Sequence, residues 1–205
     1  MTDPTPIETR YAGCRFRSRL EARTAVFFDH LRIEWLYEPE GYEIGPADRR
    51  RRYLPDFYLP QASTWIEVKG SPDAVDCNLL ADAASKEHGL PLTLSSREGW
   101  PTLLPRIVVF GPIPDRPLFH QGITLIDGRW TAWQQMLVIC DSGDPEHSHH
   151  FTGIGNVLLI QRGRGREPKH PSNPLGMSGY GFPCPDIHGA YTAARSARFE
   201  HGEQG

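Results

Sequence analysis

Hydrophobic residues in the first half of the chain follow two kinds of spacing, and two segments have the spacing of a helix. In residues 16–32, apolar side chains recur at intervals of four and seven, which predicts an amphipathic helix. Ser18 is followed three residues later by Glu21, a capping-box pattern that places the start of this helix at Ser18. A second helix is predicted for residues 73–88, with Gly89 just past its end. The face that we expect this helix to bury contains Ala74, Cys77, Leu80, Ala81 and Ala84.

Shorter apolar runs predict β-strands. Residues 33–44 have the pattern of a strand, a break at a proline and a second short strand. Residues 53–59 and 64–70 follow as two strands joined by the four residues PQAS, a length typical of a hairpin. The segment RIVVFG at 106–111 is rich in β-branched residues, as in a buried parallel strand, and 91–96 is a further strand candidate. The order helix, strands, hairpin, helix, strand predicts an α/β fold with a mixed sheet flanked by helices.

The character of the chain changes after about residue 112. Short strands are expected near 123–126, 133–140 and 157–161, but the sequence between them is rich in Gly, Pro, His and Ser. The segment 186–202 predicts a terminal helix that docks on the rest of the molecule. The chain is therefore expected to consist of an N-terminal tail (1–12), a core (13–112) and a Gly/Pro-rich C-terminal extension (113–205).

Composition limits the classes of protein to consider. Hydrophobic residues make up 39% of the 205 residues, enough for a folded core, and the net charge of -3 offers no general attraction to nucleic acid. The four cysteines are widely separated and form no CxxC motif, which argues against a disulfide framework. The sequence shows no signal-peptide pattern and no apolar run of membrane-spanning length. These features predict a soluble cytoplasmic protein.

The predicted hairpin carries three charged residues, Asp56, Glu67 and Lys69, where a buried strand would have apolar ones. Residues two apart on a strand share a face, so Glu67 and Lys69 point together, with Ile66 and Val68 on the opposite face. Converging carboxylates attract a hard divalent cation such as Mg²⁺, and a lysine beside them supplies a donor for phosphodiester hydrolysis. The alternative is a surface hairpin whose charges face solvent.

Basic residues and one further carboxylate accompany the hairpin in the sequence. Glu21 either completes the capping box with Ser18 or joins the hairpin carboxylates, and its spacing supports both interpretations equally. Arginines near the first helix and before the hairpin supply local phosphate-binding charge, with a solvated surface as the alternative. The candidate DNA-binding residues are Arg15, Arg17, Arg19, Arg23, Arg49, Arg50, Arg51 and Arg52.

Four segments in the first part of the chain resemble, in order and spacing, the motifs of the PD-(D/E)xK nuclease superfamily. The segments are FRSRLE (16–21), YEPE (37–40), YLPDFYLP (53–60) and IEVKG (66–70). The likeness is greatest to the phage endonuclease I group of Holliday-junction resolvases, with the end-cleaving subunits of cut-and-paste transposons as further relatives. The resemblance implies a restriction-endonuclease-like mixed β-sheet and the activity of a Mg²⁺-dependent DNA endonuclease, in which Mn²⁺ substitutes for Mg²⁺. A phage or a mobile element is the implied source.

The resemblance also implies a catalytic or metal-binding role for each matching residue. Asp56 and Glu67 would be the principal Mg²⁺ ligands, Glu21 the helix carboxylate that assists them, and Lys69 the catalytic lysine. The backbone carbonyl of Val68 would complete the coordination sphere. DNA is the expected partner, with a branched junction or a mobile-element end as candidate forms and a homodimer as a candidate assembly. The alternative is a catalytically silent nuclease-like protein that binds DNA or a partner within a larger assembly.

The C-terminal extension contains a second set of candidate metal ligands. Cys140, His147, His149 and Cys184 have the chemistry of a structural Zn²⁺ site. Their spacing lacks the paired CxxC or HxxxH arrangement, so an exposed His-rich loop is the favoured interpretation. The basic, glycine-rich segment 162–170 suits a solvated loop better than a DNA contact.

Overall fold

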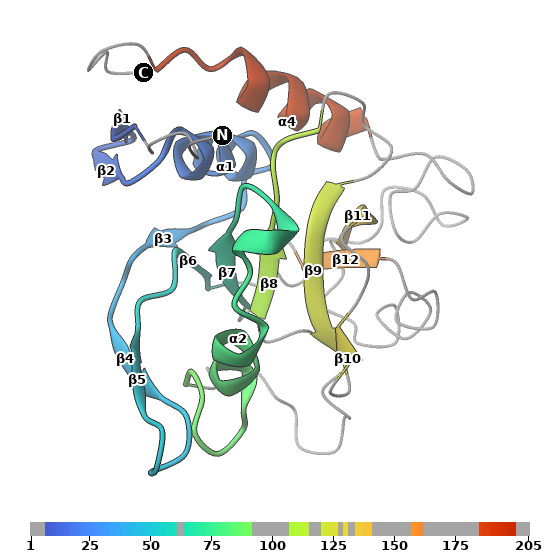
Figure 1. Cartoon of the computed structure of the whole chain (residues 1–205). Coiled ribbons are helices and arrows are strands. Elements are labelled where there is room, and N and C mark those ends of the chain that lie inside the picture. The colour runs from blue at the N-terminus through green and yellow to red at the C-terminus, as the bar shows by residue number, and fades with distance from the viewer. Residues whose placement is uncertain are drawn as a thin grey trace.

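The computed structural model describes residues 7–60, 64–91, 107–114, 120–126, 129–130, 134–140, 157–161 and 185–199. Their central feature is a mixed β-sheet (Figure 1). Its strands are β3 (Leu36–Tyr37), β6 (Phe57–Leu59), β7 (Thr64–Val68), β8 (Ile107–Phe110), β9 (His120–Ile126), β10 (Arg129–Trp130), β11 (Gln134–Cys140) and β12 (Val157–Gln161). They are hydrogen-bonded in the order β12-β11-β9-β8-β7-β6-β3, and β10 pairs with β9. The prediction of a mixed sheet flanked by helices is confirmed at this level.

Two short antiparallel ribbons lie outside this sheet, and helices cover both of its faces. The ribbons pair β1 (Thr9–Tyr11) with β2 (Cys14–Phe16), and β4 (Tyr42–Ile44) with β5 (Arg51–Tyr53). The helices of the described segments are α1 (Arg19–His30), α2 (Cys77–Ala84) and α4 (Pro185–Ser196), with a 3₁₀ turn at Pro72–Ala74. α1 and α4 lie side by side over one face, and α2 lies over the other (Figure 1).

The alternation of side chains along β7 explains why both faces need a cover. Ile66 and Val68 lie in the hydrophobic cluster beneath α1 and α4, whereas Trp65 lies in the cluster beneath α2. Successive residues of a strand point to opposite faces, so the short strand supplies both layers. The predicted packing of Ile66 and Val68 on the core is confirmed.

α1 begins where the sequence predicts. Ser18 is the N-cap, and its hydroxyl oxygen accepts a hydrogen bond from the backbone N–H of Glu21 at 3.2 Å. The helix buries Ala22, Ala25 and Phe28 against the sheet, at the spacing of three that one helix face requires. This helix carries Glu21 toward the edge of the sheet where the hairpin begins.

The first strand of the hairpin is shorter than predicted. β6 begins at Phe57 rather than at residue 53, and Tyr53 instead ends β5. Pro55 lacks a backbone N–H and restricts the residue before it, so one strand does not run through from 53 to 59. The pairing itself is confirmed, because β6 and β7 are antiparallel neighbours with Phe57 opposite Ile66.

The second helix is also shorter than predicted, and it buries a different face. Asp76 caps it by accepting a hydrogen bond from the Leu79 N–H at 2.9 Å, so helical structure starts after Asp76 rather than at residue 73. Its buried residues are Leu80, Asp82 and Ala83. The prediction that Ala74 and Cys77 are buried was wrong: Ala74 lies in the 3₁₀ turn before the helix, Cys77 is the first residue of α2, and both are exposed.

Structure beyond residue 112 continues the same sheet. β8 pairs in parallel with β7, as predicted, and in antiparallel fashion with β9, so the predicted boundary at 112–113 falls between two hydrogen-bonded strands. The predicted terminal helix is present as α4, and its Tyr191 ring stacks on Phe27 of α1 with ring centroids 5.2 Å apart. The strand candidate at 91–96 lies outside the described residues from 92 onward. No helix in the described segments has the length and apolar character needed to cross a membrane.

Candidate active site

The β6–β7 hairpin brings Asp56, Glu67 and Lys69 together. Asp56 directly precedes β6, and its Oδ2 accepts a hydrogen bond from the Val68 N–H of the neighbouring strand at 2.7 Å. The Lys69 ammonium donates to Glu67 Oε1 at 2.6 Å. Asp56 is 4% exposed and Glu67 is 6% exposed, so the two carboxylates are not on a solvated surface. The alternative of a surface hairpin with charges facing water therefore does not describe this structure.

Tyr53 holds the other oxygen of Glu67. Its hydroxyl donates to Glu67 Oε2 at 2.6 Å from the end of β5. Burial raises the pKa of the Tyr53 hydroxyl well above its usual value, and the neighbouring Glu67 carboxylate adds to the rise. Tyr53 is therefore a neutral hydrogen-bond donor that fixes the orientation of Glu67.

Glu21 both belongs to the helix cap and reaches toward the hairpin. Its Oε1 accepts a hydrogen bond from the Ser18 hydroxyl at 2.8 Å, and its Oε2 accepts from the Tyr37 hydroxyl at 2.6 Å and from the Arg17 N–H at 3.0 Å. Burial, and after it the bond to Glu21, raises the pKa of Tyr37 above its ordinary value. Glu21 therefore bonds to residues at the start of α1 and to Tyr37, and it acts on the hairpin carboxylates through its charge at Asp56.

Arg17 connects the helix side of this site to the hairpin. Its Nη2 donates to Asp56 Oδ1 at 2.8 Å, and its Nε lies 2.5 Å from Glu38 Oε1. Predicted as a DNA contact, Arg17 is instead engaged with two carboxylates of the site in this structure, although about half of its side chain remains exposed. We refer to the whole group as the hairpin cluster, which contains Arg17, Glu21, Glu38, Tyr53, Asp56, Glu67 and Lys69.

The hairpin cluster contains more acidic than basic side chains. Four carboxylates share two basic groups, Arg17 and Lys69. Burial, together with repulsion from Glu67 and Glu21, raises the pKa of the Asp56 carboxyl to about 7. The Val68 N–H and the Lys69 ammonium act in the opposite direction without cancelling it. A cation placed here would relieve this repulsion.

The chemistry of the carboxylates fits a hard divalent cation. An ionised carboxylate has about four lone-pair positions, and the hydrogen bonds described above occupy two each on Asp56 and Glu67. Each therefore retains capacity for Mg²⁺, which prefers a few carboxylate oxygens together with water. Within the described residues, no three His, Cys, Asp or Glu side chains are already arranged as a metal-binding group, so Glu21, Asp56 and Glu67 do not form one in this conformation.

Two arginines of the run at residues 49–52 form ion pairs with acidic residues of α2 and of its N-cap. Arg49 and Arg51 both form ion pairs with Asp82, at 3.1 and 3.2 Å, and Arg51 also pairs with Asp76 at 3.2 Å. We call these four residues the Asp82 cluster. Arg50 lies 3.9 Å from Glu43 on the same ribbon.

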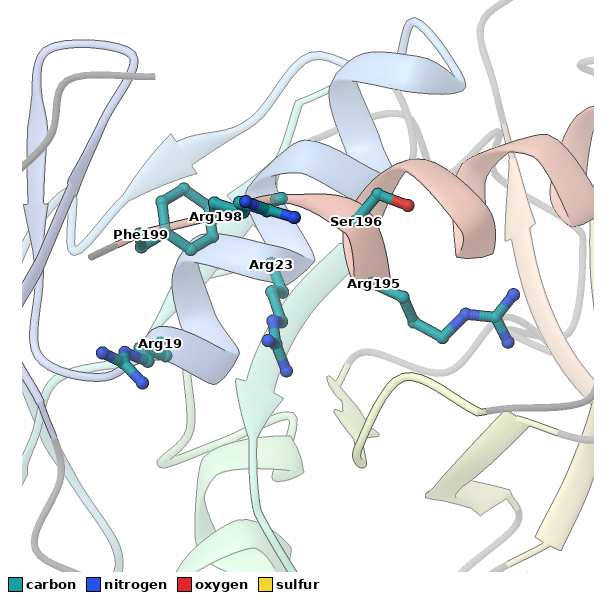
Figure 2. Close-up of a pocket in the computed structure, with 7 residues that line it drawn as sticks. Arg19, Arg23, Arg195, Ser196, Arg198 and Phe199 are labelled. Atoms are coloured by element: carbon teal, nitrogen blue, oxygen red, sulfur yellow. The ribbon is translucent and has the colours of Figure 1, made fainter.

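The other predicted DNA-binding arginines differ in their surroundings. Arg52 lies in β5, and Arg15, in β2, forms an ion pair with Glu8. Arg19 and Arg23 extend from α1 into a separate cavity (Figure 2). The structure thus distributes the predicted basic residues over several sites rather than over one continuous surface.

Of the candidate zinc ligands, Cys140 is the last residue of β11. His147, His149 and Cys184 lie outside the described residues. The zinc hypothesis therefore stays a prediction.

Sequence reasoning did not identify Tyr53 or Glu38 as members of the site, nor the contact between Tyr37 and Glu21. The available signal was weak: Tyr37 and Glu38 lie in the YEPE segment, and Tyr53 opens YLPDFYLP, yet an aromatic residue in an apolar run normally predicts core packing. Their roles depend on hydroxyl positions that only the fold establishes.

Comparisons with models of protein families, with curated proteins and with solved structures give no significant match to this chain.

Proposed function

We propose that the protein is a metal-dependent phosphodiester hydrolase that acts on DNA, with Mg²⁺ as its metal and a restriction-endonuclease-like arrangement of its core. The observation that carries the proposal is the buried pair Asp56 and Glu67, which meets a lysine at the end of one hairpin. The order of α1, the antiparallel pair β6–β7 and the parallel neighbour β8 supports the fold assignment.

Mg²⁺, when bound, would supply Lewis-acid polarisation of a phosphate oxygen and lower the pKa of an attached water. Asp56 and Glu67 would hold it, and Glu21 lies near enough in space for its charge to influence Asp56. The carbonyl of Val68 is a further candidate ligand because Val68 lies between Glu67 and Lys69 on the strand.

The chain's own groups have separate tasks in this proposal. Tyr53 donates to Glu67 and keeps one carboxylate oxygen oriented, while the Val68 N–H does the same for Asp56. Lys69 lies 2.6 Å from Glu67 and presents an ammonium group to the negative charge that develops on a phosphate during hydrolysis. A site with fixed donors and little solvent gives such charge–charge interactions their largest effect.

The test is a cleavage panel of plasmid, linear, single-stranded and four-way-junction DNA, with Mg²⁺ or Mn²⁺. Wild-type protein is expected to cut at least one substrate, and Glu67→Ala or Lys69→Ala to reduce the rate by about 100-fold or more. Lys86→Ala, which removes an exposed lysine after α2, is the matched control and should cut normally. Undiminished cleavage by folded Glu67→Ala and Lys69→Ala variants would refute the site assignment.

One observation favours a second candidate function, a nuclease-like protein that binds DNA or a partner without cutting. The Arg17 guanidinium already forms an ion pair with Asp56. A cation of the protein thus balances part of the negative charge that a metal would otherwise neutralise. Salt-sensitive DNA binding with no cleavage by wild type, across several metals and DNA forms, would support this function over hydrolysis.

A further inference from the structure

A positively charged site lies between α1 and the end of α4, away from the hairpin. It is a cavity of about 360 Å³, and the described residues of its wall include four arginines and no acidic side chain (Figure 2). Arg19 and Arg23 come from the first half of α1, Arg195 from the last turn of α4, and Arg198 from the segment that follows it. Phe199 completes the wall beside Arg198. We call this the arginine pocket.

Most of this charge has no acidic counterpart in the part of the chain that the structure describes. No carboxylate there forms an ion pair with Arg19, Arg23 or Arg198, and the buried Nε atoms of Arg19 and Arg23 have no hydrogen-bond acceptor there either. A buried N–H without an acceptor is unfavourable, and so is the mutual repulsion of several guanidinium groups around one cavity. Arg195 differs, because its Nη1 donates to the Pro114 carbonyl at 2.8 Å and is held in place.

The position of Arg19 in α1 adds a third unfavourable interaction. Arg19 is the first residue of the helix, where the backbone dipole carries partial positive charge and acidic residues are favoured. The carbonyl end of α4, which carries Arg195 in its last turn, offsets only part of the positive charge. An anion with several acceptor oxygens, bound in the pocket, would offset the like charges and the positive end of α1.

We propose that the arginine pocket binds a phosphate group of the DNA strand, outside the bond that is hydrolysed. Guanidinium groups present forked donors that match the oxygens of a phosphate, and four arginines line this one pocket. This inference rests on the proposed function for its choice of DNA, since a free phosphate or a mononucleotide carries the same chemical group.

The geometry of α1 relates the arginine pocket to the hairpin cluster. Arg19 and Arg23 lie two residues before and after Glu21, so they project from a different side of the helix than Glu21 does. A helix with its side chains is about 10 Å across, which sets the order of the separation between the two sites. The phosphate bound by the pocket is therefore a different one from the phosphate attacked at the hairpin cluster.

The test measures binding of duplex DNA by fluorescence anisotropy in metal-free buffer, over a range of salt concentrations. Arg23→Gln and Arg198→Gln are each expected to weaken affinity about tenfold and to lower the salt slope by about one. The matched control is Arg10→Gln, which removes an exposed arginine from β1 and should change affinity less than about twofold. Arg198 is itself exposed and follows the helix, so its replacement tests the pocket without a core change.

A second arm titrates inorganic phosphate and a mononucleotide calorimetrically. DNA affinity that falls in both pocket variants supports the proposal in full. Phosphate or mononucleotide binding that needs Arg23 and Arg198, with DNA affinity unchanged, supports a phosphate site but overturns DNA as its source. Wild-type affinity of both variants for every probe overturns the pocket itself. Because these are binding measurements, a wild-type protein that binds through the pocket but cuts nothing would refute only the proposed hydrolysis.

Discussion

Asp56 and Asp82 are both buried aspartates that accept hydrogen bonds from arginine, yet the charge around them differs. In the Asp82 cluster, two carboxylates meet two arginines, because Arg51 pairs with both Asp76 and Asp82 while Arg49 pairs with Asp82. Acid and base are matched in number. The contacts connect the start of β5 and the loop before it to α2, which indicates that this cluster holds the ribbon against the helix.

The hairpin cluster lacks that balance. Asp56 has one arginine partner, Arg17, which it shares with Glu38, and the only other cation is Lys69 on Glu67. The carboxyl pKa of Asp56 rises as a result of burial and of the neighbouring carboxylates. Two clusters with similar residue types thus differ in one property, excess negative charge, and that property is what a cation site requires.

The largest predicted consequence is a stability that falls as pH rises. The pKa of Asp56 is about 7 in the folded protein against an ordinary value of 3.8, so between these values only the folded state holds the proton. The free energy of unfolding should therefore drop from about pH 4 to about pH 7, by up to about 4 kcal/mol in total. Denaturant titrations in EDTA at several pH values measure this.

The matched variant for that experiment is Asp56→Asn, which cannot ionise. It should be less sensitive to pH than the wild type over the same window and more stable relative to it at pH 8 than at pH 4. Parallel curves for the two proteins would show that Asp56 does not carry the excess charge.

The Asp82 cluster should respond to loss of its acid instead. Asp82→Ala leaves Arg49 and Arg51 without their shared partner, and we expect a loss of about 2 kcal/mol in unfolding free energy at pH 7. The value is moderate because both arginines reach solvent. Thermal denaturation is the measurement, with Asp48→Ala, an exposed aspartate, as a control that stays within about 0.5 kcal/mol.

An Asp82→Ala variant as stable as Asp48→Ala would mean that matched charge in this cluster contributes nothing. The balance of charge would then not distinguish the two clusters, and only the burial of Asp56 and Asp82 would remain to be compared.

The contrast also shows what the sequence was able to predict. Helix α1, its cap at Ser18, the β6–β7 pairing and the buried strand β8 follow from local spacing, which the fold preserves. The approach of Asp56 to Val68 follows from that pairing, because hairpin register places those atoms. The contact of Lys69 with Glu67 follows from the alternation of side chains, because residues two apart share a face.

Features that depend on distant contacts were not predictable in the same way. Arg17 and Arg49 belong to similar basic runs, but one pairs with Asp56, 39 residues later, and the other with Asp82, 33 residues later. The continuation of the sheet from β8 to β9, and the stacking of Tyr191 on Phe27, likewise depend on long-range packing that leaves no local pattern.

A metal titration tests the excess charge more directly. Mg²⁺ at ten times its dissociation constant should stabilise the wild type at pH 8 by about 1.4 kcal/mol, because only the folded state presents the site. Glu67→Gln should lose this gain, whereas Asp76→Asn, which alters a carboxylate of the Asp82 cluster, should keep it. The shift in melting temperature with added Mg²⁺ is the measurement, and an equal shift in all three proteins would place the metal elsewhere.

The smallest predicted effect is that of replacing Tyr53 by phenylalanine, a substitution that changes no charge. Tyr53→Phe removes the hydroxyl that donates to Glu67 at 2.6 Å and leaves one buried carboxylate oxygen without that donor, at a cost of about 1 kcal/mol. Tyr11→Phe removes a similar hydroxyl bond, 2.7 Å to Asp29, at an exposed site and should cost less than about 0.5 kcal/mol. Urea titration measures the stability that each variant loses. If the dependence of the unfolding free energy on urea concentration is unchanged, the shift in midpoint urea concentration gives the loss. If the variants lose equal stability, burial adds nothing to the Tyr53–Glu67 bond, and the orientation of Glu67 would have to come from Lys69 alone.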